Sequence, residues 1–127
     1  MKYYTKKQVD GGFTDVLERT KSALLGEGFG VLTEIDVRAT MKKKLDKEFG
    51  NYVILGACNP PLAYQALSSE KDIGLLLPCN VVVYEEDNKT FVSAIVPSVA
   101  MSMVENSHVG EVAVSVDEKL ERVIAAI

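Results

Sequence analysis

The sequence predicts an α+β fold of two layers, in which two long helices pack on one face of a largely antiparallel sheet. Residues 13–27 and 109–127 repeat apolar side chains at steps of three and four, as amphipathic helices do. The other apolar runs are short and β-branched or alternating, and two of them flank the turn Asp87-Asn88-Lys89, which is typical of a hairpin. A length of 127 residues suits a single domain over residues 1–127.

The first elements are a strand and a helix. Tyr3 to Val9 alternates weakly and carries two lysines, which suits a strand at the edge of a sheet. Phe13 to Glu27 forms one apolar stripe, and we expect Gly26 and Gly28 to end this helix.

A second strand and a short helix follow. Phe29 to Val37 places β-branched residues at every second position and predicts a strand. Ala39 to Phe49 is polar and rich in lysine, so we expect a helix on the surface. Its few apolar residues recur at every fourth position: Met41, Leu45 and Phe49.

The middle of the chain predicts a central strand and another helix. Tyr52 to Ala57 is almost continuously apolar, so we expect a strand buried on both faces. Asn59 and Pro60 then favour a helix start, because asparagine caps helices well and proline suits the first helical position. This helix closes within residues 68–72.

The last part predicts a hairpin and the second long helix. Residues 81–85 and 90–96 are the hairpin strands, and residues 99–104 form a short apolar helix or turn. Asn106 offers a cap for the final helix. Its apolar stripe comprises Val109, Val112, Ala113, Val116, Leu120, Val123, Ile124 and Ile127.

Composition excludes several classes of protein. The net charge of −4 argues against a nucleic-acid-binding face, and no apolar run reaches the roughly 20 residues that span a bilayer. The N-terminal segment lacks the apolar region of a signal peptide, so we expect a cytoplasmic protein. The single histidine, His108, excludes a histidine-rich metal site and weakens any proposal of a histidine-activated nucleophile.

The candidate site lies in two similar segments, each holding a cysteine followed by asparagine and flanked by proline. They are Cys58-Asn59-Pro60 and Pro78-Cys79-Asn80. We take Cys58, Asn59, Pro60, Cys79 and Asn80 as candidate binding residues. Two cysteines are too few for a disulfide-built fold, and in a reducing compartment they are thiols.

The two thiols allow several interpretations. A disulfide between Cys58 and Cys79 would close a loop of about 20 residues and stabilise the fold by roughly 3 kcal/mol. As metal ligands the same two thiolates can hold copper(I) or share zinc, the remaining ligands coming from a dimer. Cys58 at a helix start can also act as a nucleophile, although no usual base lies near it in the sequence. Alternatively, both are inert buried side chains.

A family resemblance extends over nearly the whole chain. It is carried by residues 35–37, Thr40, Lys44, Leu45, residues 54–60, Leu62, Ala63, Ala66, Leu67, residues 73–81, Val83 and Pro97. These resemble the family called domain of unknown function 302, most specifically in the two cysteine–asparagine segments. The resemblance implies a strand, a helix, four strands and a helix, with short helices inserted, similar to the TATA-binding-protein-like and helix-grip group. It implies no activity. Members often carry an acidic residue before the proline after the hairpin, where this chain has Val96.

Two hypotheses follow. The first is a non-enzymatic module that binds a small ligand or a partner, works as a homodimer, and uses a cleft between the long helices and a concave sheet. The Cys58 and Cys79 segments would lie at the lip of that cleft. The second is a thiol-dependent redox or soft-metal-handling protein that uses the same two cysteines. Neither hypothesis identifies a cofactor or ligand.

Overall fold

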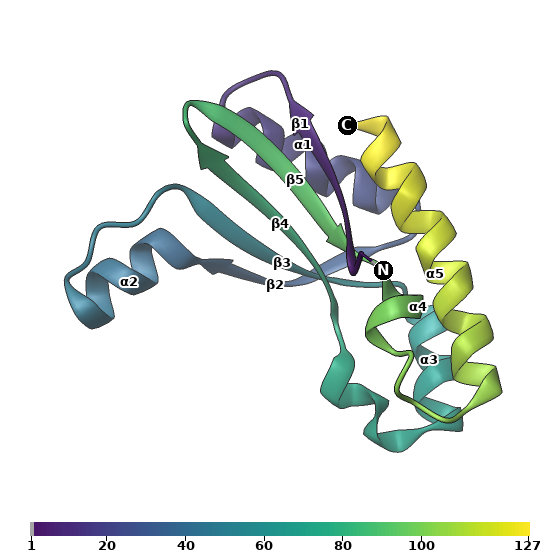
Figure 1. The fold of residues 1–127 in the computed structure, drawn as a ribbon. Helices are drawn as coiled ribbons and strands as arrows, with labels where there is room; N and C mark the ends of the chain where they lie inside the picture. The colour runs from purple at the N-terminus through teal and green to yellow at the C-terminus, as the bar shows by residue number, and fades with distance from the viewer. Residues whose placement is uncertain (1) are drawn as a thin grey trace.

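In the computed structural model, which describes residues 2–127, this part of the chain forms one five-stranded antiparallel sheet in the order β1-β5-β4-β3-β2 (Figure 1). The predicted α+β class is confirmed. The elements along the chain are β1 Tyr4–Val9, α1 Phe13–Gly26, β2 Gly30–Asp36, α2 Val37–Leu45, β3 Tyr52–Cys58, α3 Pro60–Ser69, the 3₁₀ helix η1 Lys71–Leu76, β4 Cys79–Glu86, β5 Lys89–Ile95, α4 Pro97–Ala100 and α5 Ser107–Ala126.

The core lies between the sheet and the two long helices. Both predicted apolar stripes are buried: α1 contributes Val16, Leu17, Thr20 and Leu24, and α5 contributes Val109, Val112, Ala113, Val116, Leu120, Val123 and Ile124. On the sheet side they meet alternate residues of β4 and β5, namely Val81, Val83, Val92 and Ala94. Each fully buried valine or leucine contributes roughly 1.5–3 kcal/mol, so this layer supplies most of the hydrophobic stabilisation.

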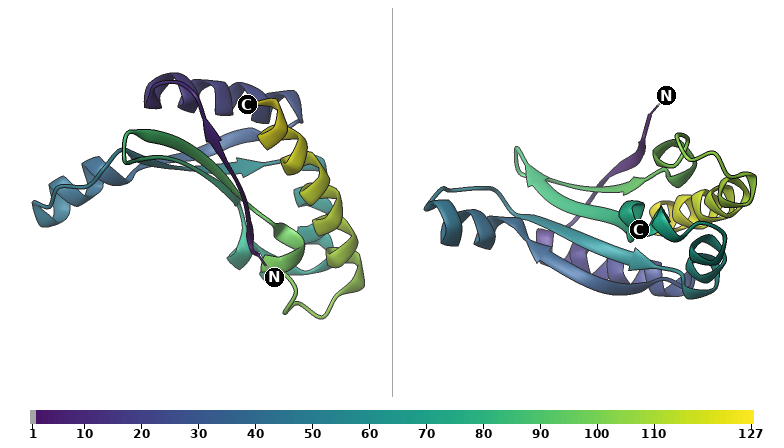
Figure 2. Two further views of the ribbon diagram at one scale, coloured as in Figure 1. Left: turned by 45° about the horizontal axis from the view of Figure 1, so that its top comes forward. Right: turned by 90° about the horizontal axis from the view of Figure 1, so that it is seen from below.

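The other face of the sheet has no helical layer. Figure 2 shows the sheet curving away from α1 and α5, so that the helices cover the convex face and the concave face is open. The prediction that β3 is buried on both faces is therefore wrong: Val53, Leu55 and Ala57 are buried, but Tyr52 and Ile54 are only partly buried. An antiparallel sheet covered on one side produces this alternation.

The helix predicted over Ala39 to Phe49 is shifted toward the N-terminus. The Asp36 side chain accepts a hydrogen bond from the backbone N–H of Ala39 at 2.9 Å and caps the helix, so Val37 is helical rather than part of the strand. The helix ends at Leu45 because Asp46 adopts a left-handed conformation, with φ of 52°. No residue of α2 is buried, and the helix projects from the body of the molecule (Figure 1).

Three local predictions are confirmed. Asn59 and Asn106 cap α3 and α5 through their side chains. Asp87 and Asn88 have positive φ angles of 53° and 62°, as the two central residues of a type I′ hairpin turn require. Gly28, with φ of 84°, turns the chain after α1. Within residues 2–127 no helix combines the length and the apolar composition needed to cross a membrane.

The fold predicts opposite effects for two glycine-to-alanine substitutions. A methyl group at Gly56 of β3 would overlap the Thr33 hydroxyl and lie 2.8 Å from Cγ of Pro78, whereas one at Gly110 of α5 meets nothing within 4 Å. We expect Gly56→Ala to lower the free energy of unfolding by about 1–3 kcal/mol. Gly110→Ala should raise it by about 0.5–1 kcal/mol, because glycine weakens helix interiors. Urea unfolding of both variants measures the two effects, and a stable Gly56→Ala protein would contradict the close packing at this position.

Candidate functional site

Strand pairing brings the two cysteine–asparagine segments together. β3 ends at Cys58 and β4 begins at Cys79, and the two strands are antiparallel neighbours with Ala57 opposite Cys79. The segments therefore meet at one end of the sheet, although 21 sequence positions separate the cysteines. The sequence alone could not show this, because the pairing is non-local.

A pocket of about 280 Å³ lies where these segments meet α3 and α5. Cys58, Asn59 and Cys79 form part of its wall, and nearly all other lining side chains are apolar. The remaining lining residues are Phe29, Leu32, Ala57, Leu62, Ala63, Ala66, Leu67, Leu77, Pro78, Met101, Val109, Val112, Ala113 and Val116. This pocket is not the predicted cleft between both long helices and the concave face, because no residue of α1 lines it and the helices cover the convex face (Figure 2).

The Asn59 side chain links the start of α3 to the end of α1 beside this pocket. Its side-chain oxygen accepts a hydrogen bond from the backbone N–H of Leu62 at 3.4 Å and caps α3. Its side-chain nitrogen donates to the carbonyl of Glu27, at the end of α1, also at 3.4 Å. Both ends of the amide are thus engaged with the backbone, so Asn59 positions α3 against α1 and shapes the pocket wall.

The two thiols differ in environment. Both cysteines are free in the structure, with Cys79 buried and Cys58 partly exposed. Burial, together with the neighbouring Cys58 and Asp117, raises the pKa of the Cys79 thiol to about 11. Cys79 is therefore a neutral thiol at pH 7, which makes it a poor nucleophile. Among residues 2–127, no group of three or more His, Cys, Asp or Glu side chains is placed to hold a metal ion.

The remaining two candidate residues do not line this pocket. Pro60 occupies the first turn of α3 and is exposed. Asn80 alternates with Cys79 along β4, so it lies on the opposite, concave face of the sheet. Three of the five candidates therefore share one pocket, and the other two lie outside it.

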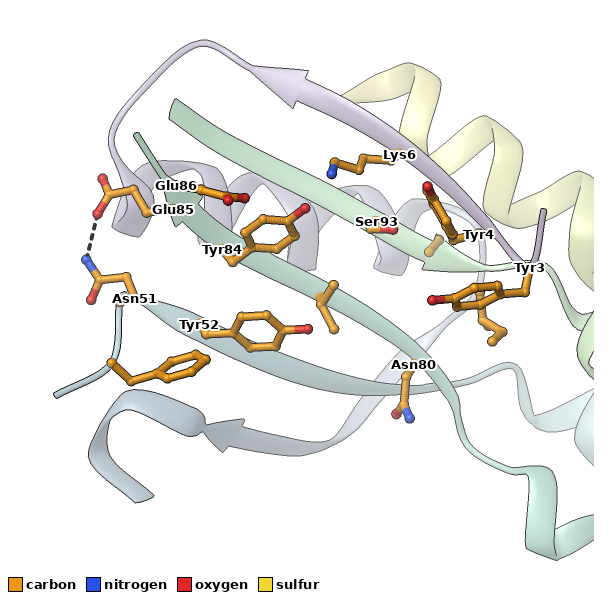
Figure 3. A pocket seen from close by; sticks show the side chains of 15 residues that line it. Tyr3, Tyr4, Lys6, Asn51, Tyr52, Asn80, Tyr84, Glu85, Glu86 and Ser93 are labelled. Atoms are coloured by element: carbon orange, nitrogen blue, oxygen red, sulfur yellow. Dashed lines mark hydrogen bonds between the residues drawn. The ribbon is translucent and has the colours of Figure 1, made fainter. Parts of the chain in front are cut away.

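The concave face holds a second and larger hollow, of about 680 Å³, that sequence reasoning missed (Figure 3). Five of its fifteen lining residues are aromatic: Tyr3, Tyr4, Phe49, Tyr52 and Tyr84. The signal that could have revealed it is the placement of aromatic residues at alternate positions facing away from the core, as Tyr52 and Tyr84 are in β3 and β4. In the sequence, each of these tyrosines taken alone looks like an ordinary packing residue.

The raised pKa of Cys79 predicts a loss of stability at alkaline pH. The thiol has its ordinary pKa of 9.0 when the chain is unfolded, but a pKa of about 11 in the folded protein. Between about pH 9 and pH 11 the unfolded state therefore binds fewer protons than the native state, so stability falls as pH rises. Two pKa units correspond to about 2–3 kcal/mol.

Chemical unfolding of the wild type and Cys79→Ala between pH 8 and 11 checks this prediction. The difference in unfolding free energy between the two proteins should shrink as pH rises, since the variant has no thiol at this position to ionise. A constant difference would show that Cys79 ionises in the folded protein as it does in the unfolded chain.

Comparison with known proteins agrees with the resemblance seen in the sequence. A family model described as "Domain of unknown function DUF302" matches residues 5–127. No curated protein matches the chain. A crystal structure of an uncharacterised conserved DUF302 protein from Bacillus stearothermophilus is similar with a TM-score of 0.91 and 29% sequence identity, over 98% of this chain and 97% of that one. The predicted family is confirmed: the chain belongs to the DUF302 family, a domain of unknown function.

Proposed function

We propose that the protein is a non-enzymatic binding module that takes a small apolar ligand in the pocket between α3, α5 and the sheet. The observation that carries this proposal is the pocket itself, whose lining is almost entirely apolar. Its volume of about 280 Å³ lies near the lower end of the range of about 300–1,000 Å³ that is usual for small-molecule sites. A ligand with a short alkyl chain or a single ring fits this size and chemistry.

The polar groups of the wall support binding rather than catalysis. Asn59 is occupied with backbone hydrogen bonds, and Cys79 is neutral. Asp117, which lies close enough to raise the pKa of Cys79, accepts a hydrogen bond from the backbone N–H of Ser98 at 3.0 Å and is not part of the lining. The wall therefore offers no paired acid and base that could move a proton during a reaction.

The mouth of the pocket also favours an apolar ligand. Leu32, in the edge strand β2, and Leu67, on α3, line the pocket and are 67% and 37% exposed. Exposed apolar side chains beside an apolar hollow are typical of ligand-binding grooves. A ligand that enters would cover both leucines and gain hydrophobic stabilisation from the area removed from water.

Thiol-dependent redox or soft-metal handling by Cys58 and Cys79 stays a prediction with less support. A redox pair needs two reactive sulfurs, and the environment of Cys79 disfavours its thiolate. Cys58 is the more accessible thiol and lies in the pocket wall. Two free thiols suit a reducing compartment, so a cytoplasmic location remains part of the proposal.

Titration of isotope-labelled protein with 1-octanol, followed by NMR, tests the proposed pocket. We expect saturable shifts of the methyl groups of Ala63, Ala66 and Ala113, because these line the pocket. Ala63→Leu fills part of the volume from α3 and should weaken octanol binding at least tenfold while keeping the fold.

Gln65→Leu is the matched control, because residue 65 lies on the same helix but is exposed and outside the pocket. It adds a leucine to α3 without filling the cavity, so its affinity should equal that of the wild type. Octanol shifts that never saturate, or equal weakening by both variants, would contradict the proposed pocket.

We also propose that the protein forms a homodimer through α2. This helix has nine residues, none of them buried, whereas isolated helices shorter than about 12–15 residues are marginal in water. Leu45 at its end is 62% exposed, and Ile35 on the adjoining edge strand is 47% exposed. A second copy of the chain that packs on this helix and strand would bury both side chains and stabilise the helix.

Sedimentation of the purified protein checks the dimer. We expect a dimer at micromolar concentrations, and Leu45→Glu should shift it to monomer because a charge replaces a buried contact. Lys43→Glu is the control, since it puts the same residue at an exposed, already charged position of α2 and should leave the dimer intact. A monomeric wild type at all concentrations would rule the dimer out.

A further inference from the structure

The hollow on the concave face is separate from the apolar pocket that Cys58 lines, called the Cys58 pocket below. It lies on the opposite side of the sheet and shares no lining residue with that pocket. We propose that this hollow binds a flat aromatic carboxylate, with the ring held between two groups of tyrosines and the carboxylate beside Lys6. This inference is independent of the proposed apolar ligand.

One wall of the hollow belongs to a row of aromatic rings across three strands, of which Tyr52 and Tyr84 line the hollow. Tyr52, Tyr84 and Phe91 are cross-strand partners in register, so their rings stack with centroids 5.4 Å apart at each step and interplanar angles of 15° and 27°. Phe49 extends the row edge-on to Tyr52 at 6.0 Å. Stacked cross-strand pairs hold one another in place, so this wall exists before any ligand arrives.

Tyr3 and Tyr4 form the opposite wall, with ring centroids 5.1 Å apart. Tyr4 pairs with Ile95, four positions along β5 from Phe91, which separates the two walls by about 14 Å at their base. Smaller side chains, including Val82 and Ser93, lie between them. Figure 3 shows the hydroxyl groups of Tyr52 and Tyr3 pointing toward each other across this floor. The gap suits a ligand of one or two rings with polar groups at its ends.

The phenol groups can donate hydrogen bonds to such a ligand. Burial raises the pKa of Tyr52, and the neighbouring Tyr84 and Tyr3 raise it further. The hydroxyl of Tyr52 is therefore protonated at pH 7. A neutral phenol donates to a carboxylate in a charge-assisted hydrogen bond, which is stronger than one between neutral groups.

Lys6 supplies the positive charge. Its ammonium lies 4.8 Å from the ring centroid of Phe91 and 5.3 Å from that of Tyr84, at the rim of the hollow (Figure 3). A hydrogen bond with Tyr84, together with the nearby Tyr4 and Glu86, raises the pKa of Lys6, so the charge persists at pH 7. Lysines 21 and 42 pair with carboxylates, but within residues 2–127 Lys6 has no ion pair.

Acidic residues lie at the hairpin end of the hollow. Glu85 and Glu86 line the hollow at the end near the hairpin, and Glu85 accepts a hydrogen bond from the Asn51 side chain at 2.9 Å. Glu86 also lies close enough to Lys6 to raise its pKa, so a ligand carboxylate would approach Lys6 from the side of the tyrosine hydroxyls rather than from the hairpin end. The curvature of the face also favours a small ligand over a second copy, because two identical concave surfaces meet only at their rims.

Titration with 2-naphthoate, followed by calorimetry and by NMR, tests the proposal. We expect saturable binding with shifts at Tyr3, Tyr52, Tyr84 and Ser93. Lys6→Met should weaken 2-naphthoate about tenfold, the usual scale for a hydrogen bond to a charged group. Lys43→Met, on α2 and outside the hollow, is the matched control and should bind as the wild type does.

The neutral amide 2-naphthamide separates the role of charge from the role of the rings. It should bind the wild type about tenfold more weakly than 2-naphthoate, and Lys6→Met should not weaken it further. Tyr84→Phe, which removes only a hydroxyl group, should weaken the carboxylate while leaving the unfolding midpoint nearly unchanged.

Three results would overturn the proposal: no saturable 2-naphthoate binding, equal losses in Lys6→Met and Lys43→Met, or shifts confined to Ala66 and Ala113 in the other pocket. Concentration-dependent shifts at Tyr3 and Tyr84 without ligand, together with a dimeric mass, would show instead that a second copy covers this face. Octanol binding at the Cys58 pocket is measured separately, so either site can fail without the other.

Discussion

The burial of only one face of the sheet is the constraint on which the rest of the structure depends. Along β4 and β5 every second residue faces α1 and α5, and the residues between them face outward. Because side chains alternate strictly in a strand, a slip of one position would move Val81 and Val83 out of the core and place Val82 and Tyr84 inside it. The hydrophobic pattern therefore fixes the register, and the register sets the composition of the open concave face.

The same pairing builds the pocket at the end of the sheet. The register of β3 and β4 sets Ala57 opposite Cys79, and the Asn59 side chain then ties the start of α3 to the end of α1. The pocket wall thus rests on strand pairing and on hydrogen bonds between the Asn59 side chain and the backbone. A wall that is ordered before binding avoids part of the entropy cost that a ligand would otherwise meet.

Local signals were readable from the sequence, and non-local ones were not. The caps at Asn59 and Asn106 and the turn at Asp87-Asn88 depend on neighbouring residues, so the sequence predicted them correctly. The end of α2 was missed because Asp46 takes a left-handed conformation within a run that reads as continuous helix. The row of aromatic rings could not be predicted, because Tyr52 lies 32 positions before Tyr84 and only the strand order brings them together. The raised pKa of Cys79 depends on its burial in the tertiary structure, which no local pattern of the sequence encodes.

The two sites differ in chemistry because they use opposite faces of one strand. On β4, Cys79 belongs to the apolar pocket, whereas the next residue, Asn80, belongs to the tyrosine-lined hollow. Side-chain substitutions on one face therefore act on one site alone, but a change that moves the β4 backbone, as at Gly56 opposite Asn80, acts on both. One shared strand can line two separate pockets in a chain of 127 residues, because each pocket needs only every second side chain.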